Sequence, residues 1–507
     1  MSIHHGMILL NSKNYSVNPA SLDSNMKKLS VKRGTRIFLS MLLWASSQSL
    51  SAQEKVWTLK DCIEYAFKNN VALNQQKLIS DISKVNYDQS KANRLPNLNF
   101  SDAQAFSFGN TIYGGGSQVI HQNTASNDPS LSSSVVLFSG FKYMNLVKEN
   151  KLNYDASKLD VETQKNNLAL NTTAAYVQVL FEYDAVIIAT HQIDADSVQV
   201  KKAAKYVAVG QLAESSLFQI IAQLATDKAA KVNAENQLQL SKVQLMQLME
   251  MSITPNFEIQ RPELKEIPQD VGSSSAEIYK IAESTFPEVK SAAIKTNAAG
   301  IDLLVNKSAL MPSLSLNGSL STEYYSTLSR ISYQTINKNE TIGYLQSNPS
   351  ENVIGQVPVT TTNTQHYPFF DQFKDNFSQL ISFNLSVPIF NNYKARNNIR
   401  LSKIAVENAR LNEQAVKNTL RKNVEQAYTD QLAAYKNFMA TVEQLNSETR
   451  AYTDMEKKFN VGLASATDYL VEKNNYYKAI LANLQAKYEY IFKTKVVDFY
   501  TGTPLTQ

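Results

Sequence analysis

The chain has 507 residues, of which 43% are hydrophobic and 19% charged, an ordinary composition for a folded protein. It contains only 15 glycines and 13 prolines, which favours long uninterrupted elements over a loop-rich fold. Residues 1–52 hold six of the 50 basic and one of the 45 acidic residues, so 44 of each remain and the charge gives no reason to expect a nucleic-acid partner.

Residues 26–52 have the order of a secretory signal peptide. Five basic residues between Lys27 and Arg36 are followed by a short apolar run at 37–44 and by small residues before Gln53. The apolar run is too short to span a membrane. We therefore expect 1–52 to be a signal peptide, with either Met26 as the start or 1–25 as an extended basic region. No later stretch is apolar enough for a transmembrane helix.

The rest of the chain is a tandem duplication with two registers. At an offset of 216 residues, Leu95-Pro-Asn-Leu98 matches Met311-Pro-Ser-Leu314. At an offset of 252 residues, a longer stretch matches at eight positions. In the first repeat these are Phe138, Lys142, Asn145, Tyr176, Leu180, Tyr183, Val209 and Gly210. The identical residues in the second repeat are, in the same order, Phe390, Lys394, Asn397, Tyr428, Leu432, Tyr435, Val461 and Gly462. The offsets differ by 36 residues, which indicates one insertion in the second half.

This register divides the chain into two repeats. We predict a first repeat at 53–254, a linker at 255–274, a second repeat at 275–502 and a tail at 503–507. Each repeat begins with a helix of about 35 residues, at 59–92 and 276–308, which ends before a proline.

Segments of alternating apolar and polar residues follow each first helix, and the alternation is weaker in 131–138 than in the others. They lie at 97–108 and 131–138 in the first repeat and at 313–325 and 377–389 in the second. One face is apolar and the other is rich in Ser and Asn, and a length of about ten residues is that of a membrane-barrel strand. A soluble sandwich is the alternative, but the chain offers nothing else to cover these apolar faces. Four strands are too few to close a barrel, and open edges cannot face lipid, so we expect the protein to oligomerise.

After each second strand the spacing of apolar residues changes to about 3.5, the coiled-coil value. The stretch 140–209 predicts roughly 105 Å of helix, and returning helices are expected at 215–249 and 465–500. A rod of this length exceeds any bilayer and must project away from it.

These features together resemble the TolC family of outer-membrane efflux proteins. The resemblance rests on the duplicated helix–strand–strand–helix–helix order, on Val387-Pro-Ile-Phe390 and on Val461-Gly-Leu-Ala-Ser-Ala-Thr-Asp468, and it covers about 56–502. It implies a mainly α fold with a membrane β-barrel part, in which a homotrimer forms a twelve-stranded barrel and a periplasmic helical tunnel. It also implies a passive exit duct that works with a periplasmic adaptor and an inner-membrane pump.

The hairpin tips are the first candidate site. Val209, Gly210 and Gln211, and in the second repeat Val461, Gly462 and Leu463, resemble the tip motif that meets the adaptor. The alternative is structural, since a glycine closes a helix through a left-handed cap with apolar neighbours packed under it. Capping explains the glycines better than it explains Leu463. The first repeat departs from the motif at Gln211, although Leu212 follows.

Asp468 is the second candidate. It matches the family position at which acidic side chains from three chains narrow the periplasmic entrance. Close carboxylates repel one another and attract cations. However, Ser465-x-x-Asp468 is also a helix-start signal, and the two roles can coexist. Val471 stands where the family often has a second acid, Glu472 points elsewhere, and Ser216 is the equivalent in the first repeat.

The insertion at 326–376 is polar and is expected to be an irregular exterior loop or a cap over the pore mouth, with the aromatic run from Tyr367 to Phe373 starting the next strand. The first-repeat loop at 109–128 is shorter. The single cysteine, Cys62, is expected to be a small buried residue.

We expect no enzyme activity, cofactor or metal, because His121, His191 and His366 are isolated and no phosphate loop is present. The rival function is a periplasm-spanning coiled-coil tether or surface adhesin. The sequence does not specify the cargo, whether small molecules or polypeptides.

Overall fold

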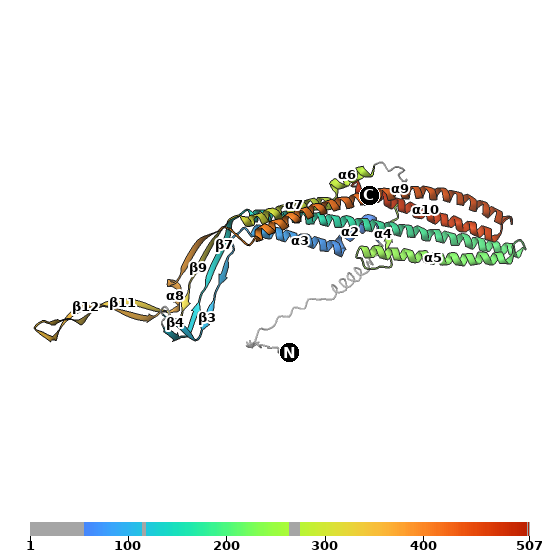
Figure 1. Ribbon diagram of the computed structural model, residues 1–507. Helices are drawn as coiled ribbons and strands as arrows, with labels where there is room; N and C mark the ends of the chain where they lie inside the picture. Colours follow the sequence, from blue (N-terminus) through green and yellow to red (C-terminus); the bar gives the residue numbers. More distant parts are fainter. Residues whose placement is uncertain (1–54, 114–117, 263–273, 504, 506–507) are drawn as a thin grey trace, which may run out of the picture. The chain divides into compact units, whose positions relative to one another are not determined.

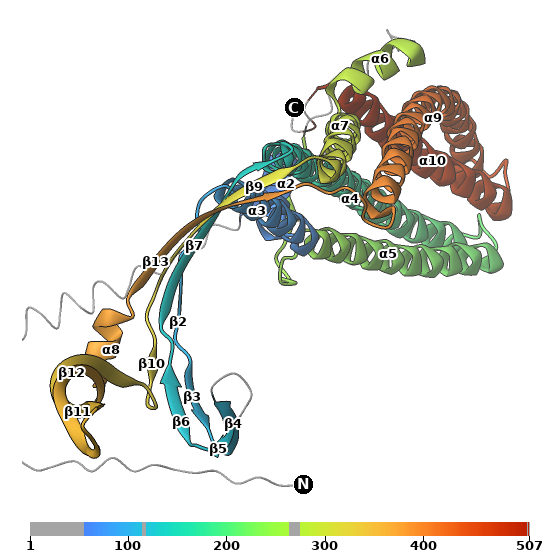
Figure 2. The same cartoon turned by 60° about the vertical axis from the view of Figure 1, so that its left-hand side comes forward.

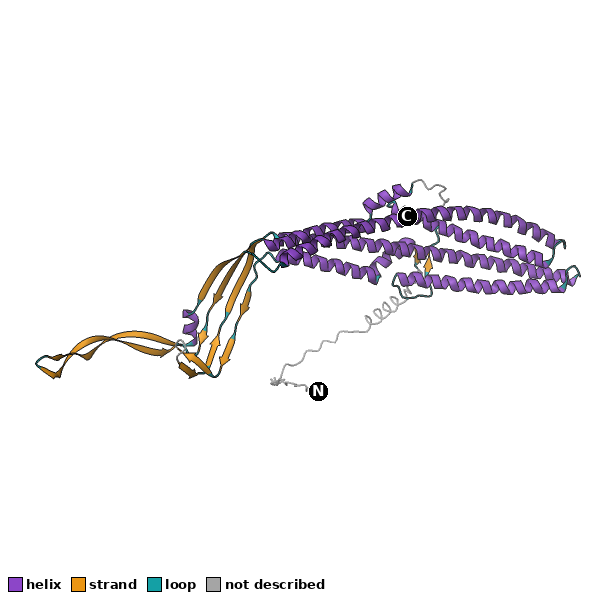
Figure 3. Ribbon diagram, viewed as in Figure 1, coloured by secondary structure: helices purple, strands orange, loops and turns teal. Residues whose placement is uncertain are grey.

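The computed structural model describes residues 55–113, 118–262, 274–503 and 505. The signal peptide predicted at 1–52, with Met26, lies outside them. Residues Val56–Gln507 form one unit, in which long helices continue at one end into β-strands (Figure 1). Apart from one short strand pair among the helices and one short helix beside the strands, helices and strands occupy separate regions (Figure 3).

The long helices show the duplication directly. α4 (Lys142–Ala208) and α9 (Lys394–Asn460) each have 67 residues, and α5 (Glu214–Leu248) and α10 (Ala466–Tyr500) each have 35. Every bound is shifted by the predicted 252 residues. We call α4–α5 the first hairpin and α9–α10 the second hairpin.

Each predicted first helix is two helices, and this corrects the sequence analysis. α2 (Leu59–Asn69) ends at Asn70, whose ψ of 125° is extended and whose side chain accepts a hydrogen bond from the Leu73 amide to start α3 (Val71–Ala92). The second repeat has an equivalent break.

That second break lies between α6 (Ser275–Thr285) and α7 (Pro287–Lys307). Pro287 occupies the first helical position of α7, and Phe286 before it is extended, as the residue before a proline prefers. One turn of 3-10 helix (η1, Ser308–Leu310) follows α7.

The main core lies around α2 and the facing stretches of α4 and α5. It contains Cys62, which is fully buried as expected, together with Leu73, Val179 and Leu245. A two-stranded parallel sheet of β1 (Val56–Trp57) and β8 (Glu258–Ile259) covers it. β8 lies in the segment predicted as the linker, of which 263–273 are outside the described residues.

Four strands form an antiparallel sheet in the order β13-β9-β7-β2. Their bounds are β2 Asn99–Ser101, β7 Ser130–Ser139, β9 Ser313–Ser321 and β13 Ser378–Ser386. The first and third predicted strands are interrupted, at Asp102 and Thr322, and continue into a second sheet of order β10-β6-β3. That sheet contains β3 Gln104–Ser107, β6 Thr124–Asn127 and β10 Tyr324–Tyr325.

The register of the four-stranded sheet puts most of its apolar residues on one face; Val136 and Leu380, which pair with Ser315 and Ser319, are the exceptions. Val135 pairs with Leu316, and Leu316 with Phe383, so one apolar row crosses three strands. The adjacent row is polar, with Ser134, Asn317 and Ser382 aligned. Phe383 is exposed on this apolar face. The predicted alternation is therefore present, with its apolar face uncovered in a single copy.

The helices next to the sheet form a layer that has the same order as the strands. α3 packs on α4, α4 on α7 and α7 on α9, and Figure 2 shows α3 and α9 on the two sides of this layer. β2 follows α3 in the chain and β13 precedes α9. The unit therefore has one edge made of β2 and α3 and another made of β13 and α9.

The insertion at 326–376 is a β-ribbon and a short helix, so the expected irregular loop is wrong. β11 (Ser329–Leu345) and β12 (Asn348–His366) pair with each other along their length (Figure 1). The aromatic run forms α8 (Phe369–Asp375) instead of starting the next strand, because Gln372 bonds to both backbone groups of Tyr325. The shorter loop at 109–128 contains β4 (Asn110–Tyr113) and β5 (Gln118–His121).

Within the described residues, no helix combines the length and apolarity needed to cross a bilayer.

Candidate functional site at the hairpin tips

Both hairpins turn through the same backbone structure. At the first tip, Gly210 has a φ of 75°, its amide bonds to the Val207 carbonyl at 3.0 Å, and the Gln211 amide bonds to the Tyr206 carbonyl at 2.8 Å. At the second tip, Gly462 has a φ of 77°, and the Leu463 amide bonds to the Lys458 carbonyl at 2.8 Å. These are left-handed C-caps, so the need for a positive φ explains both glycines.

Capping does not explain the apolar side chains beside the glycines. Val209 is 68% exposed, Val461 is 69% exposed and Leu463 is 79% exposed. None of these three side chains packs beneath its cap. Each tip therefore presents apolar surface to the solvent, and the second tip presents more of it than the first.

The two tips differ in the residue after the glycine. Gln211 of the first tip is exposed and polar. Leu212 does not replace Leu463, because it occupies the position of Ala464 and both pack into the shared core below the tips. This core contains Ala203, Ile220, Phe459, Ala466 and Tyr469. The first and second hairpins are thus joined just below two unlike tips.

Asp468 is an exposed residue in the first turn of α10. Its amide donates to Ser465 Oγ at 3.1 Å, and Ser465 Oγ donates to Asp468 Oδ2 at 2.7 Å. The capping role is therefore present in a single copy. At the first tip Ala213 precedes α5 without a side-chain cap, and Ser216 occupies the position of Asp468.

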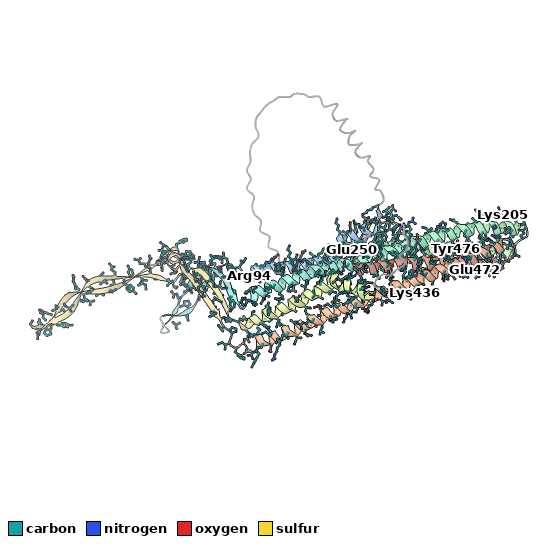
Figure 4. The ribbon with its side chains drawn as sticks, turned by 90° about the horizontal axis from the view of Figure 1, so that it is seen from above. Arg94, Lys205, Glu250, Lys436, Glu472 and Tyr476 are labelled. Carbon is teal, nitrogen blue, oxygen red and sulfur yellow. The ribbon has the colours of Figure 1, made fainter. Side chains whose placement is uncertain are left out.

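Glu472 does not add a second carboxylate beside Asp468. Burial, followed by the carboxylate of Glu448 on α9, raises the pKa of Glu472 above its ordinary value. Figure 4 labels Glu472 and Tyr476 on α10. Val471, at the second of the two positions where the sequence analysis looked for an acid, is apolar and exposed. Asp468 is therefore the only acid at these two positions.

A buried charged cluster between the hairpins was missed by the sequence analysis. It is made of Asp196 on α4, Asp227 on α5 and Lys473 on α10. The available signal was a charged residue on the core stripe of a helix, since Lys473 follows Tyr469 by four residues and both are buried. Among the described residues no three His, Cys, Asp or Glu side chains are grouped to hold a metal ion.

The comparisons with known proteins cover most of the chain. The family described as Outer membrane efflux protein matches residues 62–249 and 278–494. The Outer membrane efflux protein BepC of Brucella suis biovar 1 (strain 1330) is 20% identical over 451 residues, which are 88% of this chain and 85% of the relative.

Solved structures share the fold. CusC superposes with a TM-score of 0.70 at 17% identity, covering 88% of this chain and 92% of CusC. The Campylobacter jejuni CmeC outer membrane channel superposes with a TM-score of 0.68 at 19% identity, covering 88% of this chain and 85% of CmeC.

Proposed function

This chain belongs to the outer membrane efflux protein family, and we propose that three copies of it close into one exit duct. It is an outer-membrane efflux channel, and we place its four-stranded sheet in the membrane and its long helical hairpins in the periplasm. The finer proposals concern how copies assemble, what the tips contact and how the entrance is controlled.

The two free edges of the unit carry the assembly proposal. β13 and β2 end the four-stranded sheet, and unpaired strand edges cannot face lipid. Pairing β13 of one copy with β2 of the next satisfies both edges, and repetition around an axis closes a ring. The resemblance to the TolC family implies three copies and a barrel of twelve strands.

The helical edges support the same closure. α3 exposes an apolar stripe at Leu78, Ile82 and Val85, and α9 exposes one at Leu401, Ile404 and Leu411. Both spacings place the side chains on one face of a helix. Because α3 lies on the β2 side and α9 on the β13 side, the contact that pairs the strands would also bury the two stripes against each other.

Oligomeric mass tests this assembly. We expect the mature protein to be trimeric by native mass spectrometry in detergent. Ile82→Asp or Ile404→Asp should release monomers, because each places an unpaired carboxylate in an apolar contact. Val198→Asp is the control, since Val198 is equally exposed but lies on α4, which has neighbours on both sides. A monomeric wild-type protein, or edge variants that remain trimeric, would refute the arrangement.

We assign adaptor contact to the tips. Val209, Val461 and Leu463 are exposed apolar side chains beside the glycine caps, and in the proposed duct this end of the hairpins lies in the periplasm, toward the inner membrane. A periplasmic adaptor with apolar tips fits this surface, and an inner-membrane pump would supply the cargo and the energy. Leu463→Ser should weaken adaptor binding more than Gln211→Ser, because only the second tip carries the exposed leucine.

Asp468 is proposed to line the entrance as well as to cap α10. Three copies would bring three carboxylates to the narrow end, where they attract cations. Ser465→Ala removes the cap and leaves the charge, whereas Asp468→Asn removes the charge. Only Asp468→Asn should change the cation preference of the conductance. If the two substitutions change the cation preference equally, Asp468 acts only as a helix cap.

A further inference from the structure

Lys473 is enclosed by two carboxylates from the other hairpin. Its side chain is 1% exposed, and its Nζ lies 3.0 Å from Asp227 Oδ2 and in contact with Asp196 Oδ1. The side chains of Asp196 and Asp227 are 5% and 7% exposed. The cluster thus joins α10 of the second hairpin to both helices of the first.

The cluster lies a short distance from the tips. Asp196 precedes the end of α4 by 12 residues, or about 18 Å of helix. Gln223 Nε2 donates to Asp227 Oδ1 at 2.9 Å and to Asn474 Oδ1 at 3.2 Å, which extends the polar contact between the hairpins. The apolar core below the tips separates this cluster from the tip surface.

The charges of the cluster do not balance. Two ionised carboxylates and one ammonium leave a net charge of −1 among side chains that are at most 7% exposed. The other titratable groups that face it are Tyr477 and Tyr469 on α10 and Tyr452 on α9, whose pKa values are raised by burial, so they stay neutral. The carboxylate of Glu456 on α9, which contributes to the raised pKa values of Tyr452 and Tyr469, is negatively charged. It therefore cannot balance the charge of the cluster.

Some polar atoms of the cluster and its surroundings also lack hydrogen-bond partners. Asp196 Oδ2 and Gln199 Nε2 are buried with no hydrogen-bond partner among the described residues. The carboxyl groups of Asp196 and Asp227 both contact the same Lys473 ammonium, so two buried carboxyl groups share one cation. Burial and then the neighbouring Asp227 raise the pKa of Asp196 to about 7.

We propose that the carboxyl pair of Asp196 and Asp227 is a proton-binding site, and that the bound proton keeps α10 docked on α4 and α5. With one shared proton, Lys473 balances the remaining carboxylate and the buried cluster is neutral. Loss of the proton leaves a buried charge, which favours separation of the hairpins and entry of water. The site lies within one copy, so it does not depend on how copies assemble.

The sign of the pH dependence follows from the free energy of each state. When the hairpins separate, Asp196 returns toward its ordinary pKa of 3.8, so the docked state holds a proton that the open state releases. The opening equilibrium should therefore rise by up to about tenfold per pH unit between about pH 4 and about pH 7, and level off above.

Two measurements on the full mature protein test the site. Infrared spectroscopy should find protonated-carboxyl absorption at about pH 5 that is lost by about pH 8, and this pH-dependent absorption should be weaker in Asp196→Asn, which leaves only the contribution of other carboxyl groups with raised pKa values, such as Glu149. Hydrogen exchange should find the α10 amides around Lys473 less protected at the higher pH, after correction for intrinsic rates. Asp196→Asn should abolish this loss, because the amide keeps the cluster neutral without a proton.

Asp194→Asn is the matched control, since Asp194 lies two residues away on α4 and is exposed. It should keep both the pH-dependent absorption and the pH-dependent protection of the wild type. A wild type whose pH-dependent absorption is no stronger than that of Asp196→Asn, or Asp196→Asn with the pH-dependent protection of the wild type, would overturn the proposal.

Discussion

Gly462 and Gly300 are glycines with the same free space and different backbones. A Cβ at either position would meet no atom within 4 Å, but Gly462 has a φ of 77° whereas Gly300 lies inside α7. Gly462→Ala should lower the stability of the second tip by about 1 kcal/mol, because an L side chain is strained in the left-handed region. Gly300→Ala should raise local stability by about 0.5–1 kcal/mol.

Hydrogen exchange of the amides next to each glycine measures both effects. Opposite signs are expected at the two positions. The same sign at both would mean that free space, and not backbone conformation, decides the outcome.

Glu149 on α4 makes a second pH-dependent contribution, in this case to the free energy of unfolding. Burial and then the charge of Asp302 raise the pKa of Glu149 from 4.5 to about 7, and its Oε2 has no hydrogen-bond partner among the described residues. The folded state therefore holds a proton that the unfolded state releases, and the free energy of unfolding falls as pH rises between these values.

Glu149→Gln should remove this decline and raise the apparent Tm at about pH 8 more than at about pH 5. Thermal scans of the detergent-solubilised protein measure it. Glu162→Gln is the control, because Glu162 is exposed and its pair with Lys165 is worth little. An equal change in Tm at both pH values would contradict the prediction, because it would show that the protonation state of Glu149 does not change between them.

Local signals at single residues were readable from the sequence, and distant partners were not. Ser465-x-x-Asp468 predicted a helix start, and the structure has the cap, because both partners lie within one turn. Lys473 meets Asp227 across 246 residues, so no local pattern reveals the pair. Whether Asp468 also lines an entrance depends on other copies and stays a prediction.

At the scale of elements, the duplication made the helices predictable. Two copies of one register give two independent readings of each helix end, and the structure has equal lengths in both repeats. The breaks at Asn70 and Phe286 were missed because the apolar pattern continues through them, although Pro287 was a signal for the second. The ribbon was missed because its polar, exposed strands alternate weakly.

The ribbon of β11 and β12 should be dispensable for assembly. α8 is held on β10 without it, through Gln372 and through the contact of Phe369 with Tyr324, whose ring centroids are 4.9 Å apart. Replacing Ile331–Thr364 by Asn-Gly, a turn suited to two paired strands, should leave the oligomer and its membrane location unchanged.

Native mass spectrometry and membrane fractionation check this deletion. Gln372→Ala is the contrasting variant, because Gln372 is fully buried and its loss leaves the backbone of Tyr325 unpaired. It should lower the apparent Tm more than the ribbon deletion does. Loss of the oligomer in the deletion would place the ribbon in the assembly contact.

For the whole molecule, the order of strands and the order of helices have the same consequence. Both leave free edges on the same two sides, β2 with α3 and β13 with α9. The sequence predicted that four strands could not close alone. It did not predict which surfaces meet, because the order of packing depends on contacts between the two repeats.

Single-oligomer conductance in planar bilayers tests the central claim most directly. The purified mature protein should insert with its oligomeric mass intact and conduct ions in uniform steps. Ile404→Asp, which removes an edge contact, should give no steps at the same protein concentration. A wild-type oligomer that inserts and carries no current under any pH or voltage would contradict a duct through the assembly.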